Sequence, residues 1–276
     1  MTHEAKPSAT APVKPSVTPF ATAPAVSSAT TPPNAPRWRT VVLSPHFDDA
    51  VLSLAAVIPR LRGPVVVVTV YGGEPGPEAA VSGWDERCGF GTPHEAYEAR
   101  SVEDALALDM LGVSRITLPH PDGPYGGADQ LGHLDQWLRD LPDGIDVLAP
   151  LGTRQAHHAF VREQALLTRA AQGAPLPLIY ADLPYTGHAP GWHTDAAEAA
   201  LAAEPEHGES YRSLTDRYRL SVRWDVRLDD AQWARKRLAV QCYGSQLAPL
   251  GVDHGPFLSW SGPLRTERVW SLEQRS

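Results

Sequence analysis

The sequence contains few cysteines, no excess of basic residues and no long apolar run. Its two cysteines, Cys88 and Cys242, are too few for a disulfide-stapled fold, and their spacing fits no zinc knuckle. A reducing, cytoplasmic setting is therefore expected. The formal net charge of −8 argues against a protein that binds the nucleic-acid backbone. No apolar stretch approaches the roughly 20 residues that a membrane-spanning helix needs.

The first 36 residues differ in composition from the rest of the 276-residue chain. They are rich in proline, alanine, serine and threonine, and such a segment buries too little apolar surface to fold. They also lack the basic start and apolar centre of a signal peptide. We therefore predict a disordered leader over residues 1–36 and one domain over residues 37–276, which is long enough for a full core.

Apolar runs separated by helical patterns organise this domain. The segment 38–43, with its apolar run over 40–43, and a β-branched run over 65–70 predict two strands, with a helix between them over 49–61. Such continuous runs are typical of strands buried on both faces of a parallel sheet. Further strands are predicted over 116–118, 146–149, 176–182, 218–228 and 267–270, and helices over 95–111, 130–141 and 231–243. The fold class is α/β, a single Rossmann-like domain with a mostly parallel sheet and long loops that form a pocket at the carboxyl edge of its strands.

The helix predicted over 95–111 has a clear apolar face, which consists of Ala99, Val102, Leu106 and Met110. Gly112 then ends it in the manner of a C′ glycine. This pattern predicts an amphipathic helix.

A histidine and two adjacent carboxylates follow the first predicted strand, in Ser44-Pro45-His46-Phe47-Asp48-Asp49. Ligands bind at the carboxyl ends of strands in open α/β sheets. Adjacent carboxylates repel each other unless a cation or a helix end offsets their charge. The segment therefore indicates a metal site, whereas the alternative is that Asp48 or Asp49 caps the next helix and His46 is an ordinary loop histidine.

This segment, together with Val51-Leu52, resembles the Pro-His-x-Asp-Asp motif of the PIG-L/LmbE-like deacetylase family. That family includes zinc-dependent N-acetylglucosaminyl deacetylases. A second family motif places His-x-Asp-His after Pro-x-Gly and before Val-Arg, and the stretch from Pro150 to Arg162 is similar to it. The resemblance covers most of the chain from about Trp38 onward.

The second motif departs from the family pattern at two positions. His158 falls on its closing histidine, but His157 replaces the aspartate and Gln155 replaces the first histidine. The resemblance implies that His46, Asp49 and His158 hold Zn²⁺, or Fe²⁺ in its place. The alternative, one residue earlier, is that His157 is the third ligand. Three protein ligands would leave a coordination position open, as in catalytic zinc sites.

The resemblance also implies roles for other residues. Asp48 becomes the general base, since adjacent carboxylates can take separate roles. An oxyanion or auxiliary contact would come from the second motif, where Gln155 and His157 are candidates beside Thr153 and Arg154. The implied substrate contacts are Trp84, Arg100, Asp122 and Tyr125. For Arg100, a salt bridge to Glu103 or Asp104 within its own helix is the alternative interpretation.

The predicted function is a metal-dependent amide hydrolase. Its implied reaction removes an N-acetyl group from an N-acetylglucosamine-type sugar or conjugate, so its partner is a small-molecule amide. Two alternatives stay open at this point. One is an amidase that acts on a non-sugar acyl amide or a thiol conjugate, and the other is a Rossmann-like binding protein without catalysis. The sequence does not indicate the oligomeric state.

Overall fold

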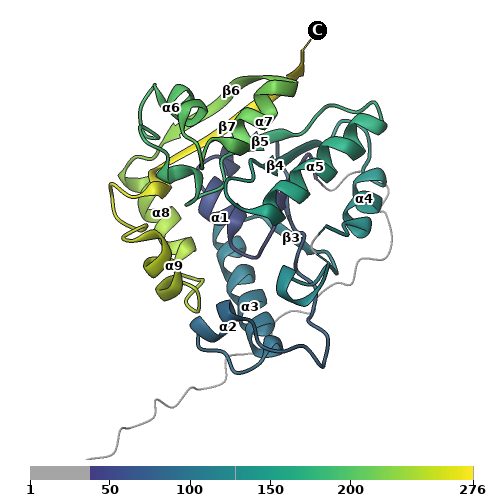
Figure 1. The fold of residues 1–276 in the computed structure, drawn as a ribbon, viewed down its shortest axis with the longest axis vertical. Helices are drawn as coiled ribbons and strands as arrows, with labels where there is room; N and C mark the ends of the chain where they lie inside the picture. The colour runs from purple at the N-terminus through teal and green to yellow at the C-terminus, as the bar shows by residue number, and fades with distance from the viewer. Residues whose placement is uncertain (1–37, 128, 276) are drawn as a thin grey trace, which may run out of the picture. The chain divides into compact units, whose positions relative to one another are not determined.

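A sheet in the order β3-β2-β1-β4-β5-β7-β6 organises the computed structural model, which describes residues 38–127 and 129–275 (Figure 1). β1 to β5 all run parallel, whereas β7 and β6 are antiparallel to their neighbours. The prediction of an α/β fold with a mostly parallel sheet is confirmed. The predicted leader lies outside the described residues. The strands are β1 (Thr40–Ser44), β2 (Val65–Thr69), β3 (Ser114–Thr117), β4 (Asp146–Pro150), β5 (Leu178–Tyr180), β6 (Tyr218–Arg227) and β7 (Thr266–Gln274).

The central strands are buried on both faces. Every residue of β1 and β2 is buried, in keeping with their β-branched composition. α1, α3 and α8 pack together on one side of the sheet, and α4 and α5 pack together on the other (Figure 1). These helices are α1 (Asp49–Leu54), α3 (Pro93–Leu111), α4 (Gly132–Arg139), α5 (Ala156–Ala171) and α8 (Asp230–Val240).

Shorter helices lie in the connections. The long loop after β2 contains α2 (Gly83–Arg87), and the stretch before β6 contains α6 (Ala197–Ala203) and α7 (Glu209–Arg217). α9 (Leu247–His254) follows α8, and single 3₁₀ turns occur at η1 (Ile58–Arg60), η2 (Gly123–Tyr125), η3 (Thr186–His188) and η4 (Pro263–Arg265). Among the described helices, none combines the length and the apolar composition that crossing a bilayer requires.

The α3 helix buries a different face from the one that its apolar pattern indicates. Val102, Leu106 and Met110 are about half exposed, with 54%, 56% and 48% of their surface accessible. The buried face instead carries Arg100 and Asp104 among small and apolar residues. Burial of charged groups requires partners, and these come from distant parts of the chain, which periodicity does not reveal.

The α1 helix ends at Leu54, seven residues earlier than the predicted Leu61. The Glu267 carboxylate on β7 accepts hydrogen bonds from the backbone N–H groups of Ala56 and Val57, at 2.9 and 2.8 Å. These amides would otherwise donate to carbonyls of the preceding turn. A side chain from the far end of the chain therefore replaces the helix hydrogen bonds at this point.

Candidate active site

The candidate site lies where the direction of strand addition reverses. From β1 the sheet grows through β2 and β3 on one side and through β4 and β5 on the other. Ligands of open α/β sheets bind at such a switch point, beyond the carboxyl ends of the strands. His46 and Asp49 follow β1, and His157 and His158 follow β4 at the start of α5. The topology thus brings the two predicted motifs to one edge of the sheet.

Ser44 fixes the loop after β1. Its hydroxyl donates to the His46 carbonyl at 2.7 Å and accepts from the Ala50 N–H at 3.0 Å. Asp48 occupies the N-cap position of α1, yet its side chain makes no capping hydrogen bond. The carboxylate of Asp49 instead accepts from the backbone N–H of His46 at 2.8 Å. Helix capping therefore does not explain the pair of aspartates.

His46, Asp49 and His158 form a buried cluster. One Asp49 oxygen, Oδ2, lies 3.1 Å from His46 Nδ1 and 3.2 Å from His158 Nε2. The three potential ligand atoms all lie within 4.8 Å of one another. His158 is fully buried, and the polar atom that its Nε2 approaches is this Asp49 oxygen. A buried imidazole nitrogen that converges with a carboxylate and a second imidazole fits a divalent cation, since two nitrogens and one oxygen suit zinc or iron.

Asp182 supports His158 from the opposite side of the imidazole ring. Its Oδ2 lies 3.0 Å from His158 Nδ1 and accepts the backbone N–H groups of Gly152 and Thr153 at 2.8 and 2.9 Å. A carboxylate that accepts from Nδ1–H leaves the Nε2 lone pair free for a metal. Asp182 lies two residues beyond β5 and was not among the predicted site residues. Its one sequence signal is a carboxylate at the end of a predicted strand.

Charge in the cluster favours a cation. Burial alone would lower the pKa of His158, but the carboxylates of Asp49 and Asp182 raise it to about 9. Burial would likewise lower the pKa of His46, and Asp122 and Asp49 hold it well above its usual value. Each imidazole is therefore surrounded by enough negative charge to bind a positive charge in a buried position.

Asp48 has a different environment from Asp49. Burial and the neighbouring Asp49 carboxylate raise the pKa of Asp48 to about 7. Burial would also raise the pKa of Asp49, but His158 and His46 hold it well below its usual range. The two adjacent carboxyl groups thus differ in proton affinity, with Asp49 tied to the histidines and Asp48 able to exchange a proton near neutral pH.

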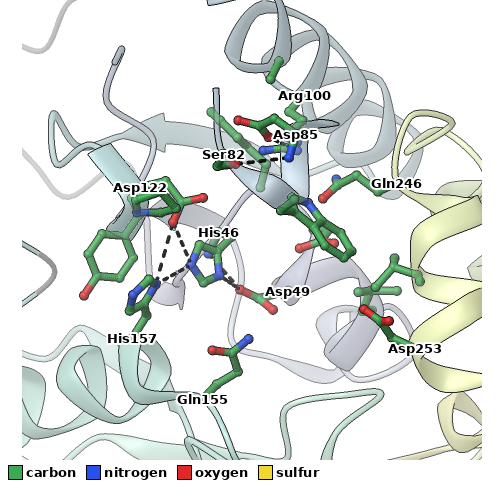
Figure 2. Close-up of a pocket in the computed structure, with 18 of the residues that line it drawn as sticks. His46, Asp49, Ser82, Asp85, Arg100, Asp122, Gln155, His157, Gln246 and Asp253 are labelled. Carbon is green, nitrogen blue, oxygen red and sulfur yellow. Dashed lines mark hydrogen bonds and ion pairs between the residues drawn. The ribbon is translucent and has the colours of Figure 1, made fainter. Parts of the chain in front are cut away.

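A second cluster shares His46. Its Nε2 lies 3.1 Å from His157 Nδ1 and 3.4 Å from an oxygen of Asp122 (Figure 2). The two histidines after β4 therefore diverge, because His158 faces Asp49 and His157 faces Asp122. The alternative in which His157 replaces His158 beside Asp49 finds no support in this geometry.

A pocket of about 760 Å³ opens over both clusters. The predicted substrate contacts Trp84, Arg100, Asp122 and Tyr125 all line it, together with Gln155, Tyr185 and side chains of α9. Figure 2 shows residues of the β2–α3 loop on one side and Asp253 of α9 on another. The pocket wall is mixed, with aromatic surface from Trp84 beside charged groups.

Arg100 pairs with Asp85 of the loop rather than with its own helix. Its guanidinium donates to Oδ1 of the buried Asp85 carboxylate. The phenol of Tyr125 donates to Oδ2 of the same carboxylate. Glu103 instead accepts from Ser245, and Asp104 accepts from Tyr243. The expected alternative of a salt bridge within the helix is therefore wrong. Asp85 is a site residue that the sequence analysis did not assign, and only its place beside Trp84 pointed to it.

The candidates for an oxyanion contact separate clearly. Thr153 is fully buried, and its hydroxyl is hydrogen-bonded to Thr186 at 2.7 Å. Gln155 lines the pocket and donates to the phenol oxygen of Tyr185 at 3.1 Å. The ring of Tyr185 meets the ring of His158 edge to face, with centroids 5.7 Å apart. Gln155 and Tyr185 therefore lie beside the first cluster, whereas Thr153 only supports the loop.

Comparison with known proteins adds to this geometry. No family model and no curated protein matches the chain. Among solved structures, the A40926 pseudoaglycone deacetylase Dbv21 is 25% identical, with a TM-score of 0.65 over 87% of this chain and 99% of that one. A zinc-inhibited form of the teicoplanin deacetylase Orf2 is 20% identical, with a TM-score of 0.66 over 86% of this chain and 99% of that one. The chain has the fold of these deacetylases.

The fold alone does not set the reaction. GalB of Pseudomonas putida, a 4-carboxy-2-hydroxymuconate hydratase, is 19% identical to this chain, with a TM-score of 0.51 over 86% of it and 98% of GalB. The prediction that this chain is a hydrolase is supported by its deacetylase neighbours. The choice of reaction must rest on the site itself.

Proposed function

We propose that this chain is a divalent-metal-dependent N-deacetylase that hydrolyses the acetamide of an N-acetylglucosamine-type sugar on a larger small molecule. The observation that carries the proposal is the cluster of His46, Asp49 and His158, in which two imidazole nitrogens converge on the Asp49 carboxylate next to Asp48. The neighbours that act in glycopeptide pathways support a sugar conjugate, and one is described in complex with teicoplanin.

In this proposal His46 Nδ1, Asp49 and His158 Nε2 hold the cation. A bound zinc or iron ion would polarise the amide carbonyl and make water more acidic. Asp48 lines the pocket next to Asp49 and takes the proton of the attacking water on its carboxylate. It then returns that proton to the departing amine nitrogen. A pKa of about 7 suits a group that must both accept and release a proton at neutral pH.

The remaining pocket residues orient the substrate. Asp122, Tyr125 and Trp84 line the pocket and offer polar contacts and an aromatic surface for the sugar ring. Arg100 is already paired with Asp85, so it acts on the sugar through its remaining N–H groups or through the loop that Asp85 anchors. Gln155 and Tyr185 lie beside His158 and are the candidates for contact with the developing oxyanion.

Elemental analysis and acetate release test the proposal together. We expect near one equivalent of zinc or iron at limiting metal, lost in His46→Ala and His158→Ala. Asp48→Asn should keep the metal and lose about 10³-fold or more in hydrolysis of an aryl N-acetylglucosaminide. Wild-type protein that binds no metal after reconstitution would overturn the hydrolase proposal and favour a binding protein. Faster hydrolysis of simple acyl amides than of acetylated sugars would favour the non-sugar amidase.

A further inference from the structure

The cluster of His46, Asp122 and His157 has the dimensions of a metal site of its own. His46 Nε2 lies 3.1 Å from His157 Nδ1 and 3.4 Å from Asp122 Oδ1, and the last two atoms are 3.7 Å apart. In a tetrahedral zinc site with bonds near 2.1 Å, ligand atoms lie about 3.4 Å from one another. The triangle therefore matches the face of a zinc tetrahedron, with the fourth position open toward the pocket.

The local backbone holds these ligands in place. Asp122 is the N-cap of η2, where its Oδ1 also accepts the Gly123 N–H at 2.6 Å. The His157 ring lies directly against Gly123, and a Cβ at that position would come within 2.0 Å of the ring. A glycine is therefore required next to Asp122 for the two side chains to approach each other. The ring of His46 is in turn stacked on Tyr71, with centroids 5.5 Å apart.

The two clusters differ in access. The side chains of Asp49 and His158 are 4% and 0% exposed, whereas those of His157 and Asp122 are 24% and 31% exposed. A cation that enters from solution thus meets the His157 cluster before it reaches the buried one. His46 belongs to both, through Nδ1 on one side and Nε2 on the other. Since a neutral imidazole offers a single lone pair, both sites cannot be filled without a cost to one of them.

We propose that His46 Nε2, Asp122 and His157 form a second zinc site whose occupation inhibits the enzyme. The inhibitory part rests on the proposed function, since it assumes that the buried cluster is the catalytic one. A second cation on Nε2 would take up the single lone pair of the neutral His46 imidazole, so the proton would sit on Nδ1 and the buried cation would lose that ligand. It would also occupy the Asp122 carboxylate, which lines the pocket. The site would bind more weakly than the buried one, because its ligands are more exposed and one of them is shared.

Zinc stoichiometry tests the second site without reference to activity. Metal-free protein is dialysed against buffers of increasing free Zn²⁺, and bound zinc is counted by elemental analysis. We expect two equivalents in wild type, the second weaker. His157→Asn and Asp122→Asn should each keep the first equivalent. Each should lower the affinity for the second zinc ion by more than about 10–100-fold, which is the loss expected when a group that only supports a ligand is removed.

A matched histidine variant separates this site from adventitious surface binding. His94 is 56% exposed, lies outside the pocket lining, and pairs with Glu74 and Glu98 at 2.9 and 3.3 Å. His94→Asn should retain both equivalents. Loss of the second equivalent in His94→Asn, or its persistence in His157→Asn, would overturn the proposal and indicate an adventitious ion only.

The other outcomes also decide. A single equivalent in wild type at all zinc concentrations, with weaker binding in His157→Asn, would overturn the second site and make His157 and Asp122 positioning residues for His46. No equivalent at all would overturn the proposed function as well, which distinguishes the two failures. Acetate release supplies the last criterion, because excess zinc should inhibit wild type and His94→Asn and should leave residual His157→Asn activity unaffected.

Discussion

The Nδ1 atom of His158 lies 3.0 Å from Oδ2 of Asp182, and both side chains are completely buried although they are 24 residues apart in the chain. Metal-ligating histidines commonly donate their second N–H to a carboxylate, which fixes the tautomer and raises the basicity of the ligating nitrogen. Asp182 is therefore placed to support His158 in the proposed metal site.

Replacement of this carboxylate should weaken metal binding. We expect Asp182→Asn to lower the affinity of the first zinc equivalent by about 10–100-fold, measured by competition with a chelator. Asp225→Asn is the matched control, since Asp225 pairs with Arg268 on the two antiparallel strands. Unchanged zinc affinity in a folded Asp182→Asn protein would contradict the supporting role.

Tyr125 connects two walls of the pocket. Its phenol oxygen accepts the Ser82 N–H at 2.9 Å and donates to Asp85, which also holds Arg100. Tyr125→Phe should remove about 1 kcal/mol of loop stabilisation. We expect a several-fold rise in KM with little change in kcat, because the proposed metal ligands are not altered. Steady-state kinetics of acetate release provide the test.

The control for this variant is Tyr211→Phe. The phenol of Tyr211 donates to Glu198 at 3.2 Å, and neither residue lines the pocket, so the substitution should leave KM unchanged. If Tyr125→Phe lowered kcat and left KM intact, the phenol would act in the chemical step rather than in positioning the loop.

Local patterns indicated the parts of the candidate site that lie close together in the chain. His46 and Asp49 are three residues apart after a strand, and the parallel sheet brings the loop after β4 beside them. Asp182 and Asp85 were not predicted as site residues, because their partners, His158 and Arg100, are 24 and 15 residues away on other elements. A carboxylate in a loop has no period, so its role appears only when the fold gives it a partner.

The same limit explains the errors in the helices. Periodicity identified the apolar stripe of α3, yet the buried face of this helix is the one that carries Arg100 and Asp104. There Arg100 is hydrogen-bonded to Asp85 and Asp104 to Tyr243. The early end of α1 depends on Glu267, which is 210 residues from Val57. In each instance a specific polar contact over a long sequence separation outweighed a local preference.

Glu267 and Lys236 form a fully buried ion pair that joins β7 to α8. The ammonium Nζ lies 2.8 Å from Glu267 Oε1 and donates to the Leu264 carbonyl at 3.0 Å. Removal of one partner of such a pair leaves an uncompensated buried charge, so Lys236→Met should lower the free energy of unfolding by about 3–5 kcal/mol. Urea unfolding measures this change.

The double variant Lys236→Met with Glu267→Gln distinguishes charge from packing. It should recover part of the lost stability, because a neutral amide oxygen can still accept an N–H at the end of α1. The pair of Arg139 and Asp135 provides the control, because the Arg139 side chain is 47% exposed and the Asp135 carboxylate keeps its other donor, Thr168, so Arg139→Met should give no resolvable change. A double variant no more stable than Lys236→Met would show that the ammonium matters through its packing.

Asp104 should make stability depend on pH. Burial, and to a lesser degree the charges of Asp48 and Asp49, raise the pKa of this carboxyl from 3.8 to about 8 in the folded protein. Its Oδ1 accepts from the Tyr243 phenol at 2.8 Å, while Oδ2 has no hydrogen-bond partner among the described residues. Between about pH 4 and pH 8 the folded state therefore holds a proton that the unfolded state has released. Folding becomes less favourable as pH rises through this window, by up to about 1.4 kcal/mol per pH unit from this group.

Asp104→Asn should remove this dependence, because an amide of the same shape carries no titrating proton. In urea unfolding of the metal-free protein, the stability of the variant relative to wild type should increase steadily from pH 5 to pH 8. Asp109→Asn, at an exposed position of the same helix, should give a difference from wild type that does not follow this trend. A difference for Asp104→Asn that is flat with pH would mean that Asp104 is ionised in the folded protein. The repulsion among the carboxylates of Asp48, Asp49 and Asp104 would then be offset by a positively charged group, and not by protonation of Asp104.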